Sequence, residues 1–298
     1  MDISINDISV KGNFLERLTG QHREFALNCG ELVKKEHRVR SLQPTGRHIG
    51  LARALSKLGF CSRAQAFDLI RAGKVRLNGS IVKNPEAGVR IGTDRIEVEG
   101  KRIGAAEKIY MVLNKPRGIV TTAADEKGRG TVYSLLPGEP SWIAPVGRLD
   151  RASEGLLLFT NDSEWAARIA DPASHLDKTY HVQICRVANK RLIERLERGV
   201  EMPDGEVLKA KRVGLLRCGE KRSWLEIVLD EGKNRQIRRM LDALGIEVLR
   251  LVRVAIGPLQ LGELAKGEHR ALRAEEKAAL DRALGLAKRN LPRRGEVG

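Results

Sequence analysis

Residues 147–162 read GRLDRASEGLLLFTND and form the most informative stretch of the chain. Leu156–Phe159 is apolar at every position, which predicts a strand buried on both faces of a sheet. Asn161-Asp162 ends the run and can cap a helix that begins near Ser163. Asp150 precedes the strand on a loop with a glycine on either side and an arginine at each neighbouring position. The pattern therefore predicts a carboxylate that a rigid strand holds at the edge of a sheet.

The residues around Asp150 do not by themselves assign its role. An aspartate between arginines is more often part of a structural ion pair than a catalytic group, because such networks are common away from active sites. The catalytic interpretation needs support from the rest of the chain.

On either side of this stretch, strand and helix patterns alternate irregularly. Ile109–Leu113 is an apolar run of strand length, and helices are predicted over 190–198 and 233–244. Further strands are predicted over 178–185, 206–213 and 223–229. Such a mixture is typical of an α+β domain with a mainly antiparallel sheet, to which we assign residues 108–274. Residues 275–298 are assigned to a basic tail that is helical at first.

Residues 48–107 are predicted to form a smaller domain of two helices and a hairpin. Leu51, Ala54, Leu55 and Leu58 lie at helical spacing. Ser62 and Gln65 can form a capping box at the start of the second helix. Asn78-Gly79 supplies the positive φ angles of a tight hairpin, Ile96–Val98 is a further strand, and 101–107 is a linker.

The small domain carries cations between its apolar positions, so that they can face outward together. Scattered Lys and Arg usually mean only a solvated helix face. The chain as a whole has 54 Lys and Arg against 38 Asp and Glu, a formal net charge of +16, which favours a polyanionic partner. The cations are Arg53, Arg63, Arg71, Lys74, Arg76 and Lys83.

The remaining composition indicates a cytoplasmic protein. Cys29, Cys61, Cys185 and Cys218 form no CxxC pair, which argues against a disulfide framework or a zinc site and favours free thiols. No apolar run approaches the ~18 residues of a membrane span. Residues 1–47 are mixed in charge, do not resemble a secretory signal, and are interpreted as an extension prone to disorder.

Residues 51–85 resemble the RNA-binding domain named after ribosomal small-subunit protein four. The similarity runs through the Ser62-Arg63 pair, Ile70, Gly73, Val75 and Asn78-Gly79. It implies that the cations of this domain contact RNA. It implies nothing about chemistry, because this domain is attached to several unrelated proteins.

Residues 147–162 resemble the catalytic motif of the RNA pseudouridine synthases of the bacterial ribosomal-RNA type. Three other motifs of that family are present in the expected order, one before this stretch and two after it. The first is Lys115-Pro116-Arg117-Gly118, usually structural, the next is Lys178-Thr179-Tyr180, and the last is residues 231–240, EGKNRQIRRM.

The resemblance implies a role for individual residues. Asp150 is the catalytic carboxylate, and Tyr180 packs on the target base. Ile237 supports the site, and Arg238 after it pairs with Asp150 and favours its charged form. Without the resemblance, Tyr180 would be interpreted as a tyrosine of the protein core. Arg148, Arg235 and Arg239 are expected to contact the RNA.

The implied chemistry is the conversion of uridine to pseudouridine. The bond from ribose to the uracil nitrogen breaks, the base turns, and a ring carbon is joined instead. No atom or electron is gained or lost, so we expect no metal, nucleotide or other cofactor. Asp150 would add covalently or abstract a proton, and the residues do not decide between the two. The target base must be flipped, at a cost of a few kcal/mol.

The expected partner is ribosomal RNA, with large-subunit RNA favoured, and the expected state is a monomer. The rival interpretation is a non-catalytic RNA-binding or ribosome-assembly protein, which would be expected to lack Asp150 or Arg238. A glycoside hydrolase would require two cooperating carboxylates, and only one stands at this site.

Overall fold

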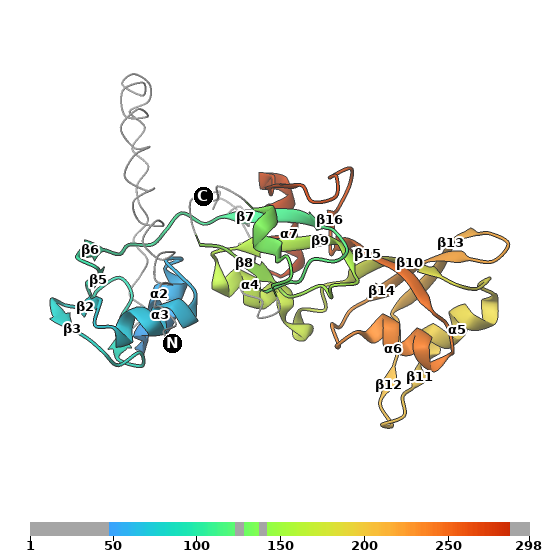
Figure 1. The fold of residues 1–298 in the computed structure, drawn as a ribbon, viewed down its shortest axis with the longest axis horizontal. Helices are drawn as coiled ribbons and strands as arrows, with labels where there is room; N and C mark the ends of the chain where they lie inside the picture. Colours follow the sequence, from blue (N-terminus) through green and yellow to red (C-terminus); the bar gives the residue numbers. More distant parts are fainter. Residues whose placement is uncertain (1–47, 123–127, 137–141, 287–298) are drawn as a thin grey trace, which may run out of the picture. The chain divides into compact units, whose positions relative to one another are not determined.

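The computed structural model describes residues 48–122, 128–136 and 142–286 (Figure 1). The predicted extension 1–47, with Cys29, and the end of the predicted basic tail lie outside the described residues. Within them, no helix combines the length and apolarity that crossing a membrane requires.

The N-terminal domain contains the predicted helices and hairpin. Ser62 Oγ accepts from the Gln65 amide at 3.1 Å, and Gln65 Oε1 accepts from the Ser62 amide at 3.0 Å, which confirms the capping box. Asn78 and Gly79 have φ angles of 51° and 88°, as the tight hairpin requires. The helices are α2 (Leu51–Lys57) and α3 (Arg63–Arg71). The strands are β1 (Ile49–Gly50), β2 (Val75–Leu77), β3 (Ser80–Ile81), β4 (Gly88–Val89), β5 (Ile96–Val98) and β6 (Lys101–Arg102).

The predicted linker 101–107 begins too early. Its first residues form β6, which completes a sheet with the order β3-β2-β5-β6. The turn from β5 to β6 is Glu99-Gly100, with φ angles of 48° and 80°. Glutamate is rarely found in this left-handed conformation, so Glu99-Gly100 is a weaker signal for a tight hairpin than Asn78-Gly79.

The C-terminal domain is built on a sheet that has nine strands in the described part of the chain, with the main order β13-β14-β10-β15-β9-β7-β17. All pairs are antiparallel except β9 with β15, so the predicted α+β class with a mainly antiparallel sheet is confirmed. The strands are β7 (Tyr110–Lys115), β8 (Ala144–Val146), β9 (Glu154–Thr160), β10 (Lys178–Ile184), β13 (Arg212–Cys218), β14 (Ser223–Leu229), β15 (Val248–Ile256), β16 (Leu259–Gln260) and β17 (His269–Ala271).

The predicted strand over 206–213 is two strands. Val207–Leu208 forms β12, which pairs with β11 (Val200–Glu201), and β13 begins at Arg212. Short 3-10 turns lie at Val132–Leu135 and Pro172–Ser174.

Strand β9 is buried along its whole length, as its sequence predicts. Leu156 and Leu158 pack into one apolar cluster, and Leu157 and Phe159 into another, because successive side chains point to opposite faces of the sheet. Asp162 follows the strand and caps α4 (Ser163–Ala170), as predicted, by accepting from the next amides. The strand ahead of which Asp150 stands is therefore fixed on both faces.

Helix α7 (Ala274–Ala283) belongs to this domain and not to a tail. Its Leu280 is fully buried in the cluster that contains Trp165 of α4, and Trp165 Nε1 donates to Asp281 Oδ1 at 3.0 Å. The predicted domain boundary after residue 274 is therefore too early, because helical periodicity could not show what the helix packs against.

Helices α5 (Lys190–Arg198) and α6 (Gln236–Ala243) cover one face of the sheet beside β10, β13 and β14 (Figure 1). Leu196 and Met240 anchor them in one apolar cluster with Val182. Helix α6 begins at Gln236 and not at 233 as predicted, because Arg235 takes a φ angle of 47° and stops the helix there.

Candidate active site

The loop that carries Asp150 is held by a buried lysine. Lys115 is fully buried at the end of β7, and its Nζ donates to the carbonyl oxygens of Pro116, Asp150 and Ser153 at 3.0, 3.1 and 2.9 Å. An ammonium group has three N–H donors, and here each has an acceptor. Burial lowers the pKa of Lys115 to about 8, although the nearby carboxylates of Asp150 and Glu154 oppose the shift.

The other carbonyl groups of the loop also have donors from outside it. As a result every carbonyl from Leu149 to Ser153 accepts a hydrogen bond, and the backbone under Asp150 is fixed from several sides. The remaining pairs are Thr121 Oγ1 to Leu149 O at 2.8 Å, the Gly118 amide to Arg151 O at 2.8 Å, and Arg238 Nη2 to Ala152 O at 3.0 Å.

Asp150 presents its carboxylate to Arg235 and not to Arg238. Arg235 Nη1 lies 3.5 Å from Asp150 Oδ2, and about a third of the Asp150 side chain (34%) is exposed. The positive φ of Arg235 places this residue just before α6 and not on the outward face of a helix. Non-glycine residues in that conformation are uncommon and gather at functional sites. Arg235 therefore has a contact within the site, and its predicted phosphate contact stays a prediction, since its side chain is half exposed.

Arg238 supports the loop without forming the predicted ion pair. It is half-buried, donates to Ala152 O, and has Nη1 3.5 Å from Val248 O. Burial lowers the pKa of Arg238, and the charge of Arg235 adds to this effect, while Asp150 opposes it. Since α6 starts after Arg235, Arg238 lies one turn further along and reaches the backbone behind Asp150.

A pocket of about 320 Å³ opens at Asp150. Its volume is at the lower end of the roughly 300–1,000 Å³ usual for small-ligand sites, which suits one nucleotide. Tyr180 and Ile237 line it, Tyr180 half-buried and Ile237 only 4% exposed, and the exposed Arg148 stands at its mouth. The structure thus brings together Asp150, Tyr180, Ile237 and Arg148.

Arg239 is engaged elsewhere. It donates to Glu206 Oε2 at 2.9 Å and lies 3.4 Å from Asp204 Oδ2, so two carboxylates compensate its charge. This does not favour the predicted phosphate contact. The sequence could not show it, because Asp204 and Glu206 come from a turn between short strands that only the fold brings to α6.

The six cations of the N-terminal domain are all exposed, as predicted. Some have partners within the domain: Lys74 pairs with Glu99 at 2.7 Å, and Arg76 donates to Gly79 O at 3.0 Å. Arg71 lies over the Phe67 ring. Among the described residues no ion-pair partner is found for the other three, which are Arg53, Arg63 and Lys83.

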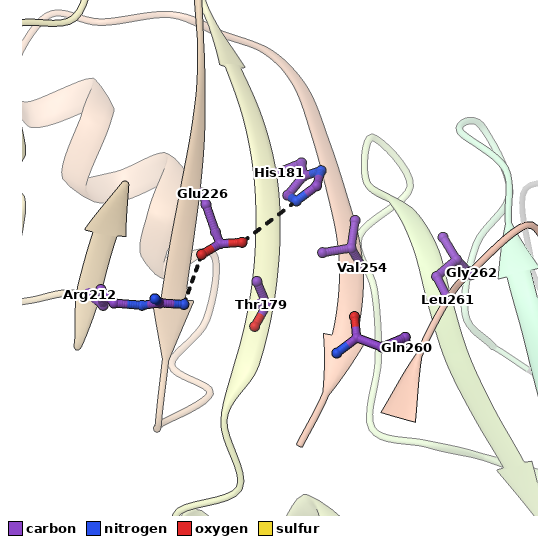
Figure 2. A pocket seen from close by; sticks show the side chains of 8 residues that line it. All are labelled: Thr179, His181, Arg212, Glu226, Val254, Gln260, Leu261 and Gly262. Carbon is purple, nitrogen blue, oxygen red and sulfur yellow. Dashed lines mark hydrogen bonds and ion pairs between the residues drawn. The ribbon is translucent and has the colours of Figure 1, made fainter. Parts of the chain in front are cut away.

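A second hollow, of about 520 Å³, lies on the opposite face of the same sheet (Figure 2). Thr179 and His181 line it, and they flank Tyr180 along β10 and therefore point away from the pocket of Asp150. Its only carboxylate among the lining residues, Glu226, is bound by Arg212 at 2.8 Å and lies 3.9 Å from His181. Asp150 and Tyr180, which the sequence indicates as site residues, line the other pocket, which is therefore the better candidate reaction site.

No potential metal site was found in the described part of the chain, where no three His, Cys, Asp or Glu side chains cluster suitably.

Comparisons with known proteins agree with this geometry. A family model described as RNA pseudouridylate synthase matches residues 109–243, and an S4 domain model matches 49–96. Ribosomal large subunit pseudouridine synthase B of Bacillus subtilis is 40% identical over 229 residues, which cover 76% of this chain and 93% of the relative. The chain belongs to the RNA pseudouridine synthase family.

Two further relatives of this RNA pseudouridine synthase agree. An uncharacterized RNA pseudouridine synthase of Aquifex aeolicus is 38% identical over 78% of this chain and 93% of its own length. A crystal structure of a pseudouridylate synthase superposes with a TM-score of 0.54 at 31% identity, covering 78% of this chain and 99% of that one. The protein is therefore an isomerase that acts on RNA, with an S4 RNA-binding domain ahead of its catalytic domain.

Sequence reasoning missed the positions of Lys115 and Arg235 in the site. One feature of the sequence could have indicated Lys115: it is a lysine at the end of an apolar strand, directly before a proline. Arg235 had no such feature, because nothing in the local sequence indicates its positive φ.

Proposed function

We propose that this enzyme isomerises one or more uridines of ribosomal RNA, in the large subunit, with Asp150 as the catalytic carboxylate. The observation that supports this most is the accessible Asp150 carboxylate on a loop whose carbonyls are all hydrogen-bonded, at the mouth of a nucleotide-sized pocket. The assignment to the large subunit rests on the similarity to the Bacillus subtilis protein of that name.

In this proposal the target uridine leaves its stack and enters the pocket. Tyr180 offers a flat face to the extruded base, and such stacking contributes ~1–3 kcal/mol per base. Flipping costs a few kcal/mol, so an unpaired uridine in a loop is favoured. Arg148, exposed at the mouth, contacts the RNA backbone around the flipped nucleotide.

Asp150 acts in its ionised form. The guanidinium of Arg235 lies 3.5 Å from its Oδ2, and the fixed loop keeps the carboxylate directed at the nucleotide. Both routes, covalent addition and proton abstraction, begin from this carboxylate. Lys115 and Arg238 serve as positioning residues, since they hold the backbone on which Asp150 stands.

The test is a map of pseudouridines in all cellular RNA from cells with the gene, without it, and with Asp150→Asn in its place. The amide keeps the size of the side chain and removes the ionised oxygen. We expect at least one large-subunit pseudouridine to disappear in the deletion and to stay absent with Asp150→Asn, while the variant protein remains folded and binds RNA. Turnover by the purified variant within tenfold of the wild-type rate would contradict the role of Asp150. A dependent pseudouridine found only in other RNA would contradict the ribosomal assignment.

A further inference from the structure

Arg253 lies at the floor of the pocket beside Tyr180. The two residues are directly opposite each other in the antiparallel pairing of β10 and β15. Opposed residues on neighbouring antiparallel strands project from the same face of a sheet. Both line the pocket that contains Asp150. The two side chains therefore leave the sheet on the side of the pocket, and the guanidinium of Arg253 extends towards β9, where it meets Leu156 O.

The surroundings of Arg253 leave part of its hydrogen-bonding capacity unused. The residue is only 6% exposed, and its Nε donates to Leu156 O at 2.8 Å, which fixes the guanidinium plane. Its Nη2 is buried and meets no acceptor among the residues that the structure describes. Within those same residues no carboxylate forms an ion pair with it. A buried arginine without a carboxylate partner is rare, because desolvation of the charge is costly.

The charge of Arg253 acts on the rest of the pocket floor. Lys178, which also lines the pocket, has its pKa lowered, first by burial and then by the charge of Arg253, while Asp177 and Asp230 oppose the shift. The floor therefore holds two cations near enough for the charge of one to act on the other. A hydrogen-bond acceptor or an anion that enters the pocket would stabilise these two cations.

We propose that Arg253 is a substrate-binding residue whose guanidinium donates to a carbonyl oxygen of the target uracil. This inference deepens the proposed function and rests on its nucleotide pocket. A guanidinium has donors only, and uracil offers the acceptors O2 and O4. Cytosine carries an amino donor in place of O4, so a donor facing that edge disfavours it.

The depth of Arg253 favours the base over a phosphate as its ligand. A phosphate keeps contact with water, and exposed cations that suit it, Arg148 and Arg235, already line the pocket. Only the flat base reaches the sheet itself, where Tyr180 lies. The guanidinium of Arg253 is therefore left to an edge of the uracil ring.

The test uses the full-length enzyme and an RNA hairpin whose loop carries the uridine identified by the cellular map. The hairpin is synthesised with uridine, 2-thiouridine or 4-thiouridine at that position, since sulfur accepts hydrogen bonds poorly. Single-turnover rates are measured by chromatography of the digested nucleosides. We expect one of the two thio substitutions to slow the wild-type enzyme by about tenfold to a hundredfold, the loss typical of one charged hydrogen bond.

The variant Arg253→Met should turn over uridine slowly and lose its sensitivity to that thio substitution. Arg253→Gln keeps a neutral donor and should recover part of the rate. Arg250→Met is the matched control: Arg250 lies on the same strand and makes two hydrogen bonds to the buried Glu154, so its removal costs stability. It should keep the thio sensitivity of the wild type.

Three results would overturn the inference. The first is a folded Arg253→Met enzyme with the wild-type rate on uridine. The second is an Arg253→Met enzyme that is slow but as sensitive to both thio substitutions as the wild type, which would indicate a phosphate contact or a structural role. The third, which needs no variant to fold, is a wild-type enzyme insensitive to both. If no cellular pseudouridine depends on the chain, the proposed function fails instead, and the two failures are thus distinct.

Discussion

Replacing Gly155 by alanine should separate two strands directly under the active site. Gly155 lies in β9 between Lys115 of β7 and Arg253 of β15. A Cβ built on it would lie 2.2 Å from Arg253 O and 2.8 Å from Arg253 N. These are backbone atoms of a central strand, so they cannot move aside as a flexible side chain can. The φ angle of Gly155, +102°, is itself unfavourable for alanine.

The expected loss of stability is the sum of two effects. An unfavourable backbone conformation costs ~1–3 kcal/mol, and inserting a methyl group into a packed interior costs typically ~1–3 kcal/mol more. Gly118→Ala is the matched control, because Gly118 has a φ angle of +96° but no atom within 4 Å of its added Cβ. We therefore expect ~2–6 kcal/mol for Gly155→Ala and only the backbone part for Gly118→Ala.

The assay is urea unfolding followed by tryptophan fluorescence. The chain has three tryptophans, Trp142, Trp165 and Trp224, all after residue 107, so the signal reports the C-terminal domain. Turnover at saturating RNA, corrected for the folded fraction, should also fall for Gly155→Ala, because the neighbouring strands hold Lys115 and Arg253. Equal losses of stability in the two variants would refute the reasoning. They would mean that β9 and β15 can move apart to admit a methyl group without a loss of folding free energy.

Three other outcomes are expected. Tyr180→Phe should keep most of the RNA affinity and turnover, while Tyr180→Ala should lose at least ~1 kcal/mol of binding to the target nucleotide; equal behaviour of both and the wild type would remove Tyr180 from the base. Turnover should decline as the pH rises through about 8, because Lys115 then loses the third N–H that its carbonyl partners need. The titration of Lys115 does not itself unfold the protein: its pKa is lower in the folded state than in the unfolded state, so it contributes more to stability as the pH rises from about 8 towards 10.5. A turnover that does not change over this pH range would contradict the role of Lys115. Arg53→Gln with Arg63→Gln should weaken RNA binding and make its log–log salt dependence shallower by about 0.7 to 0.9 per contact, whereas Lys74→Gln, whose cation is paired with Glu99, should change the slope less.

The features that the sequence predicted are those set by neighbours along the chain. The all-apolar run of β9, the cap at Asp162 and the capping box at Ser62 each depend on residues within one turn or one strand. The loop of Asp150 follows from β9, because a strand buried on both faces must emerge at an edge of the sheet. Local physics therefore sufficed to place the candidate carboxylate.

The features that the sequence did not predict depend on register between distant strands or on one backbone angle. Arg253 faces the pocket only because it is paired with Tyr180, 73 positions earlier, across a register shift in β10 and β15. Arg235 meets Asp150 only because its φ angle is positive. In both cases an arginine in a basic chain looks like any other solvated cation until the fold assigns its neighbours.

Two buried cations of the site, Lys115 and Arg253, indicate function and not only stability. Lys115 and Arg253 are buried without a carboxylate in hydrogen-bond contact, and both instead donate to backbone carbonyls near Asp150 or behind it. Apolar residues of similar size would avoid the cost of desolvating these charges, so stability alone does not account for them. Lys115 is explained by the loop that it holds in place, since all three of its donors are used. Arg253 still has a buried donor without an acceptor among the described residues, and its side chain lines the pocket in which Asp150 would act. Of these two buried cations, Arg253 is thus the one that keeps hydrogen-bonding capacity for a substrate.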